Sequence, residues 1–158
     1  MAFYLEEMTA GSPVASETWQ KWFQTWLEAL TAELPPADSY ELSLRLTGDR
    51  EIQQLNSQYR QQDQPTDVLA FAALEVEIPE PTDAAHFTEP LYLGDIVISL
   101  ETATRQSQQQ GHSLAVELAW LAAHGLLHLL GWDHPDEESL ALMLERQKIL
   151  LTGVDLFG

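Results

Sequence analysis

The hydrophobic positions of the first third predict a helix and then a turn. Between Glu17 and Leu34, apolar side chains recur every three or four residues, which is the period of one helix face. This stripe comprises Trp19, Trp22, Phe23, Trp26, Leu27 and Leu30. Three tryptophans in one stripe are compatible with a cofactor platform, but we favour core packing. Pro35 and Pro36 end the helix, because proline has no backbone N–H to donate.

Alternating or continuous apolar residues predict the strands. The stretch "YELSLRLT" places Tyr40, Leu42, Leu44 and Leu46 on one face, as in a half-buried strand. "TDVLAFAA" and "YLGDIVISL" are apolar and contain β-branched residues, so they predict two more strands. Residues 2–8 are a fourth, short candidate. Between the second and third of these stretches, the acidic and proline-bearing residues 75–90 are expected to form an exposed loop.

The other helices are predicted from periodicity and from their end signals. In "GDREIQQLNSQYRQQ", Asp49 is a plausible N-cap, and Ile52, Leu55 and Tyr59 share one helix face. The last third predicts three helices, at about residues 100–110, 113–130 and 137–152. Gly111 separates the first two of these helices, and Gly131 ends the second.

This order of elements indicates the fold class. Strands and helices are mixed along the chain, and helices cluster at its end, which predicts an α+β fold with a small mixed sheet of about four strands packed with helices. A chain of 158 residues is long enough to bury one core. We therefore expect a single domain that spans residues 1–158.

Composition narrows the protein class. Hydrophobic residues make up 45% of the chain and charged residues 20%, as in ordinary globular domains. The chain has no cysteine, so neither a disulfide nor a thiolate metal ligand is available. The start of the chain has no signal-peptide pattern, and its longest apolar run, residues 118–132, is too short to span a membrane. We therefore expect a cytoplasmic protein with no membrane segment.

The charge of the chain complicates any nucleic-acid role. The formal net charge is −18, and only 7 residues are lysine or arginine. Binding to RNA or DNA usually depends on cations that neutralise phosphates, so this charge by itself argues against nucleic acid as a ligand. It suits a protein partner at least as well.

The stretch "HGLLHLLGWDH" carries the strongest chemical signal. His124 and His128 lie four residues apart, and therefore on one face of the predicted helix. Gly131 can take the left-handed conformation that ends a helix, which lets His134 approach the first two histidines. Imidazole is a preferred zinc ligand, and three protein ligands plus water are typical of catalytic zinc. The sequence thus predicts one metal site at the C-terminal end of this central helix. His86 and His112 have no second histidine at such a spacing, and we expect neither to bind metal.

The same spacing is also that of the metzincin peptidases. Those enzymes carry glutamate directly after the first histidine as general base, whereas this chain has Gly125. A zincin-like metallopeptidase is therefore an alternative that needs a base elsewhere, for which Asp133 and Glu117 are candidates.

Three stretches together resemble one known family. "HGLLHLLGWDH" is similar to the H-G-x-x-H-L-x-G-Y-D-H motif of the YbeY family, which are metal-dependent endoribonucleases specific for single strands. "LNSQYRQQDQPTDVLAFA" and "LGDIVIS" resemble two further motifs of that family, in the same order. The sequence departs from the family pattern at Ala70, Ala72 and Trp132, none of which is a ligand position. The resemblance covers roughly residues 40–135.

The resemblance implies a function and a set of site residues. It implies one zinc ion per chain held by His124, His128 and His134, with Arg60 in the cleft as a catalytic residue. It also implies a role in 3′-end maturation of 16S ribosomal RNA and in ribosome quality control. A ribosome-associated factor without enzymatic activity, holding a structural zinc, is an alternative beside the peptidase. The implied partners are single-stranded RNA, ribosomal RNA, and the ribosome or its associated proteins.

Three further side chains bear on this site. Arg60 is one of few cations in an acidic chain, and its planar guanidinium can donate to two phosphate oxygens. The alternative is an ordinary solvated position on the helix surface, which is usual for arginine. Asp95 and Asp133 are candidates to accept a hydrogen bond from a metal-bound imidazole, and turn or capping roles suit them equally. The general base and the nucleophile are not indicated by the sequence.

Overall fold

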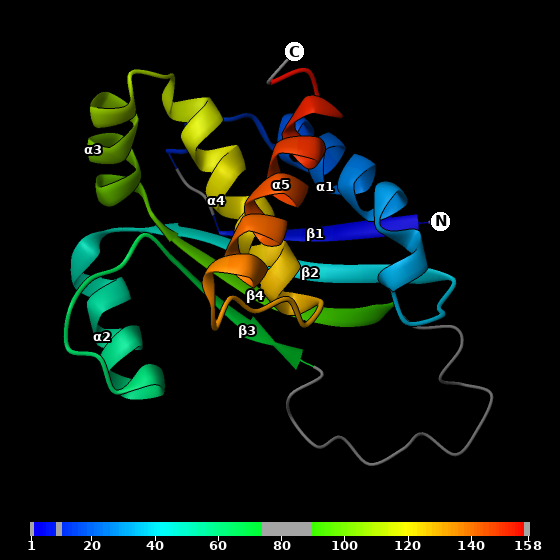
Figure 1. The fold of residues 1–158 in the computed structure, drawn as a ribbon, viewed down its shortest axis with the longest axis horizontal. Coiled ribbons are helices and arrows are strands. Elements are labelled where there is room, and N and C mark those ends of the chain that lie inside the picture. Colours follow the sequence, from blue (N-terminus) through cyan, green and yellow to red (C-terminus); the bar gives the residue numbers. More distant parts are fainter. Residues whose placement is uncertain (1, 9–10, 74–89, 157–158) are drawn as a thin grey trace.

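A four-stranded mixed sheet forms the centre of the molecule. The computed structural model describes residues 2–8, 11–73 and 90–156. The strands are β1 (Ala2–Met8), β2 (Ser39–Thr47), β3 (Val68–Ala72) and β4 (Leu91–Ser99), in the spatial order β1-β2-β4-β3 (Figure 1). β1, β2 and β4 are parallel, and β3 runs antiparallel to β4. The predicted small mixed sheet and its four strands are confirmed.

The helices cover the two faces of the sheet unequally. They are α1 (Ser16–Ala29), α2 (Asp49–Arg60), α3 (Leu100–Gln110), α4 (Leu114–Leu129) and α5 (Glu137–Thr152), with a short 3₁₀ turn at Thr31–Glu33. α4 packs on β3 and β4, with α1 and α5 on the same side of the sheet (Figure 1). α2 packs on the opposite face, where Ile52 joins Leu69 and Val97 in a small second core. The expected α+β class is therefore observed.

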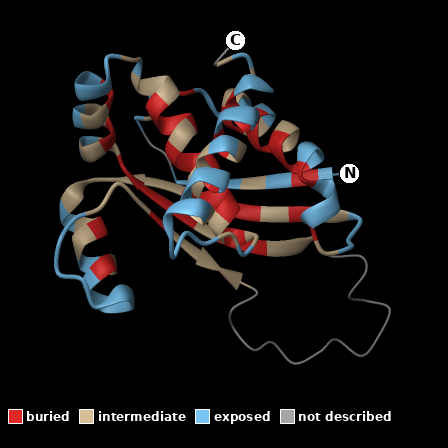
Figure 2. Cartoon of the chain, viewed as in Figure 1, coloured by how far each residue is buried: buried red, intermediate tan, exposed pale blue. Residues whose placement is uncertain are grey.

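The main core lies between the sheet and α1, α4 and α5 (Figure 2). Most of α4 is buried, as expected for a helix that is apolar on nearly all sides. Trp19 and Trp26 are fully buried in this core. The predicted core role of the tryptophan stripe is confirmed, and these rings do not form a cofactor platform.

The first helix ends earlier than predicted. α1 stops at Ala29, and Leu34 has an extended backbone, so the expected end at Leu34 is wrong. Two local causes explain the difference. The residue before a proline is disfavoured in the helical region, which excludes Leu34. The hydroxyl of Thr31 also donates to the carbonyls of Leu27 and Glu28, and thereby satisfies the end of the helix.

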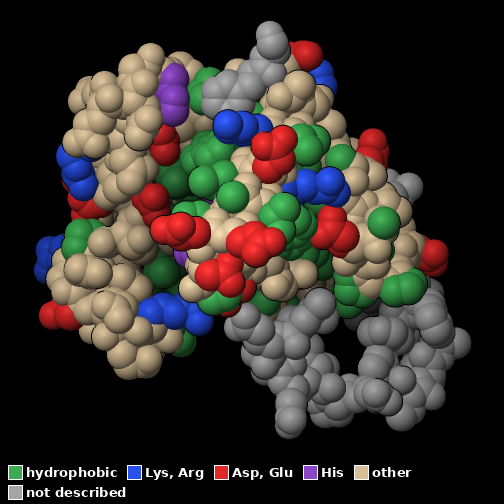
Figure 3. Space-filling view, viewed as in Figure 1, with side chains coloured by type: hydrophobic (Ala, Val, Ile, Leu, Met, Phe, Trp, Pro, Cys, Tyr) green, Lys and Arg blue, Asp and Glu red, His purple; other side chains and the backbone are tan. Residues whose placement is uncertain are grey.

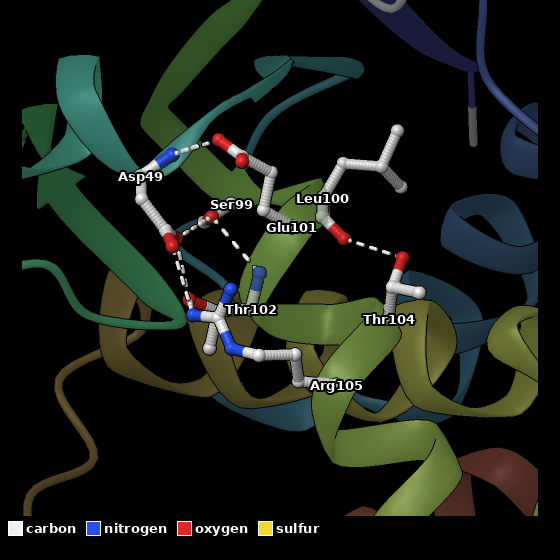
Figure 4. Close-up of polar contacts among 7 residues, drawn as sticks. All are labelled: Asp49, Ser99, Leu100, Glu101, Thr102, Thr104 and Arg105. Carbon is white, nitrogen blue, oxygen red and sulfur yellow. Dashed lines mark hydrogen bonds and ion pairs between the residues drawn. The ribbon is translucent and has the colours of Figure 1, made fainter.

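Asp49 has a different role from the predicted N-cap. The N-cap of α2 is Gly48, and Asp49 is the first helical residue. Its carboxylate instead accepts hydrogen bonds from the side chains of Ser99, Thr102 and Arg105 at the start of α3 (Figure 4). These bonds, led by those from Ser99 and Thr102, lower the pKa of Asp49 from 3.8 to about 2. Asp49 thus joins α2 to α3.

The sequence also predicts an exposed acidic loop and no membrane segment. Residues 75–89 of the expected acidic loop, and His86 within them, lie outside the described residues. Within the residues that the structure describes, no helix combines the length and apolar character needed to cross a membrane.

Candidate metal centre and active site

The C-terminal end of α4 brings the three histidines together. His124 and His128 project from the same face of α4, and their Nε2 atoms lie 3.0 Å apart. His134 follows in the turn after the helix, with its ring centroid 5.8 Å from that of His124 and 5.5 Å from that of His128. One nitrogen from each ring lies within 4.8 Å of the others. The three side chains are therefore close enough to bind one metal ion.

Gly131 makes the turn that brings His134 back. Its φ of 96° lies in the left-handed region, which residues with a Cβ rarely adopt. The N–H of Gly131 donates to the carbonyl of His128, and the N–H of Trp132 donates to that of Leu127. These two bonds form a Schellman motif, which satisfies the last carbonyls of α4. The predicted helix end at Gly131 is confirmed.

The electrostatics of the cluster favour neutral imidazole at its centre. Burial lowers the pKa of His128 below 6.5, and the neighbouring His124 and His134 lower it further. Protonated imidazole cannot bind a cation, whereas the neutral ring offers a lone pair. The surroundings of His128 therefore favour the form that a metal ion requires.

The second nitrogen of His124 has a partner that was not predicted. Nδ1 of His124 lies 3.0 Å from Oε1 of Gln147 on α5, and the side chain of Gln147 is fully buried. The amide nitrogen of Gln147 donates to the carbonyl of Trp120, which leaves Oε1 to accept from Nδ1–H. This arrangement directs Nε2 of His124 toward the other two rings. One feature of the sequence could have indicated this role. Gln147 is the polar residue among the buried positions of α5, which are Met143, Gln147, Leu150 and Leu151.

Neither aspartate proposed from the sequence hydrogen-bonds an imidazole in the described structure. The carboxylate of Asp133 accepts from the backbone N–H of His134, 2.8 Å away, and so shapes the turn. Asp95 accepts from the hydroxyl of Tyr92 and lines a different pocket. For Asp133 the turn role is therefore the observed one.

Arg60 lies in the same pocket as the three histidines. This pocket has a volume of about 620 Å³ and is also lined by Asp67 and Asp133. Arg60 is exposed at the end of α2, and its Nη2 donates to the carbonyl of Ala70, 2.7 Å away. Arg45, Arg105 and Arg146 form ion pairs with carboxylates, whereas Arg60 forms none among the described residues. The structure thus places an arginine without an anionic partner beside the histidine cluster.

Gly125, where the metzincins carry their glutamate, packs tightly against the sheet. A Cβ added at Gly125 would lie 2.9 Å from a methyl group of Ile96 on β4, so α4 approaches the sheet closely here. Glu117, one of the two bases considered for a peptidase, is buried, and its Oε1 lies 2.7 Å from Nε2 of His112. Both residues line a different pocket from that of the histidine cluster. Of those two candidates, only Asp133 lines the pocket of the histidines.

The fold and the site together define an α+β protein with a three-histidine centre at the end of its central helix. A family model described as Endoribonuclease YbeY matches residues 5–155. A protein of Cyanothece sp. named Endoribonuclease YbeY is 66% identical over 149 residues, which cover 94% of this chain and 86% of that protein. A Nostoc sp. protein of the same name is 64% identical over 143 residues, which cover 90% of this chain and 77% of that protein.

A solved structure agrees in fold. The solution structure of a Thermotoga maritima protein aligns with a TM-score of 0.58 at 24% identity, and covers 96% of this chain and 89% of that one. The chain belongs to the Endoribonuclease YbeY family. The resemblance seen in the three sequence stretches is confirmed.

Proposed function

We propose that this protein is a zinc-dependent endoribonuclease that cuts single-stranded RNA and forms one domain over residues 1–158. The observation that carries the proposal is the pocket that combines three imidazoles with an arginine that forms no ion pair with any carboxylate of the described residues. Membership of a family whose members are named endoribonucleases gives the reaction class.

The donor set fits zinc. Three imidazole nitrogens from His124, His128 and His134 would hold the ion, and no thiolate is available in this chain. Three protein ligands leave a fourth position for water or substrate, as in catalytic zinc sites. When bound, the ion supplies a Lewis acid for a phosphoryl oxygen and lowers the pKa of a coordinated water.

Arg60 acts on the phosphate. One of its nitrogens is held by the carbonyl of Ala70, which fixes the side chain at the edge of the pocket. The remaining N–H groups can donate to two phosphate oxygens in a planar fork. Arg60 thereby orients the scissile phosphate and stabilises the charge that develops on its oxygens during cleavage.

The family and the charge support a proposal for the biological substrate. We assign the enzyme to 3′-end maturation of 16S ribosomal RNA and to ribosome quality control in the cytoplasm. A net charge of −18, with acidic side chains spread over the face in Figure 3, disfavours binding of free polyanions, so we expect the ribosome or an associated protein to present the RNA strand.

Metal analysis combined with an RNA cleavage assay tests this proposal. Wild-type protein should contain one zinc ion per chain and cut a single-stranded RNA, and His124→Ala should lose both properties. His112→Gln is the matched control, because His112 lies outside the cluster. It should keep its zinc. Cleavage that persists in zinc-free His124→Ala would refute the proposed role of the metal centre.

A further inference from the structure

A second pocket lies on the other face of the sheet. It has a volume of about 460 Å³, within the range of small-molecule sites. The strand register pairs Phe71 with Asp95, and Arg45 with both Met8 and Val97, so these side chains share one face. This is the face on which α2 packs, opposite the main core. The pocket therefore lies between the sheet and the end of α2.

Arg60 joins this pocket to the histidine pocket. Its side chain lines both, with the histidines on one side and Tyr59, Phe71 and Leu55 on the other. The guanidinium carbon lies 5.1 Å from the centroid of the Phe71 ring, a cation–π distance. A ligand whose phosphate binds Arg60 can therefore place its neighbouring group in the second pocket.

The lining of this pocket suits a flat aromatic ring. The Tyr59 and Phe71 rings lie 5.3 Å apart in a T-shaped contact, which restrains both. Tyr59 shares a helix face with Ile52 in the sequence pattern, yet Ile52 is fully buried and Tyr59 remains 53% exposed. Stacking on such a ring is a source of RNA affinity that does not depend on cations. A chain with a net charge of −18 needs such a source.

We propose that this pocket is a base-binding subsite for the RNA nucleotide next to the scissile phosphate. The base stacks on Tyr59 while the phosphate contacts Arg60, and this assignment rests on the proposed ribonuclease function. The pocket holds the carboxylate of Asp95, which repels phosphate, and its other cation, Arg45, is paired with Glu51. The base rather than the backbone therefore enters. The same carboxylate offers a hydrogen-bond acceptor to an amino group of the base.

An abasic scan tests the subsite. Single-stranded RNAs of one sequence, each with one base removed near the cleaved bond, are cut under single-turnover conditions. The zinc-loaded protein is in excess over the RNA but below the concentration that saturates the rate. For wild type, the rate should fall roughly ten- to a hundredfold when the base at one flanking position is absent. Tyr59→Ala should cut the intact RNA more slowly by a similar factor and should no longer respond to the loss of that base. Tyr59→Phe should behave as wild type.

Tyr4→Ala is the matched control. Tyr4 is also 53% exposed, but it lies on β1 and does not line the pocket. It should keep both the wild-type rate and the wild-type response to base removal. If Tyr59→Ala retains the full response to base removal, the subsite is refuted although the enzyme cuts RNA. If zinc-loaded wild type cuts none of the RNAs, the proposed function itself fails, and the subsite fails with it.

Discussion

Replacing Arg60 with alanine should separate catalysis from stability. Arg60 is exposed, and among the described residues it makes one hydrogen bond, to the Ala70 carbonyl, and a contact with the Phe71 ring. A single hydrogen bond to a charged group contributes about 1.5–3 kcal/mol when buried, and exposure reduces this value. We therefore expect the free energy of unfolding to fall by about 1 kcal/mol or less. Zinc content should not change, because Arg60 is not among the ligands.

The effect on cleavage should be much larger. Loss of one preorganised donor to a developing oxyanion costs about 3–4 kcal/mol, which is roughly 10²- to 10³-fold in rate. Arg60→Lys should recover only part of this loss, because an ammonium keeps the charge but not the planar fork.

The assay is single-turnover cleavage of a single-stranded RNA at equal zinc occupancy, with thermal unfolding measured in parallel. Arg105→Ala is a suitable control. Arg105 is paired with Asp49 and lines neither the histidine pocket nor the second pocket, so its loss should leave the chemical step nearly intact. If Arg60→Ala cuts as fast as wild type, the catalytic role assigned to Arg60 is wrong.

Three further results are expected. Gln147→Leu should weaken zinc binding by about ten- to a hundredfold, measured by competition with a chelator, because Nδ1 of His124 loses its acceptor. Asp49→Asn should lower the free energy of unfolding by about 1–2 kcal/mol at pH 7, and the difference should disappear as the pH falls from 4 to 2, because the folded pKa of about 2 lies below the unfolded 3.8. A pH-independent difference in denaturant unfolding would contradict that role for Asp49. Zinc-loaded wild type should leave unstructured casein intact while it cuts RNA, and casein hydrolysis that disappears in His128→Ala would restore the peptidase alternative.

Local patterns were enough to predict most of the elements. The four strands, and the helices of the last third, follow from apolar periodicity together with Gly111 and Gly131 as end signals. The histidine cluster could also be predicted, because all three residues lie within one helix and the turn after it. Such features depend on neighbours in sequence, which the chain itself displays.

Contacts between distant segments could not be predicted in the same way. Asp49 is of a residue type common at N-caps, but its partners lie some fifty residues later. Ser99 ends β4, and Thr102 and Arg105 are in α3. Gln147 supports His124 from another helix, and its role depends on how α5 packs on α4. The sequence order alone does not show which face of the sheet α2 covers. The second pocket beside Arg60 depends on that choice.

Stepwise return of zinc to metal-free protein tests the central claim most directly. Removing the metal from the three-histidine centre should abolish RNA cleavage while circular dichroism shows that the fold persists, because the apolar core is built from residues other than the three histidines. On addition of zinc, the single-turnover rate should rise in proportion to bound metal and reach its maximum at one ion per chain. Metal-free protein that cuts RNA at the wild-type rate would contradict the claim that this centre is catalytic. Loss of the fold together with the metal would instead indicate a structural zinc.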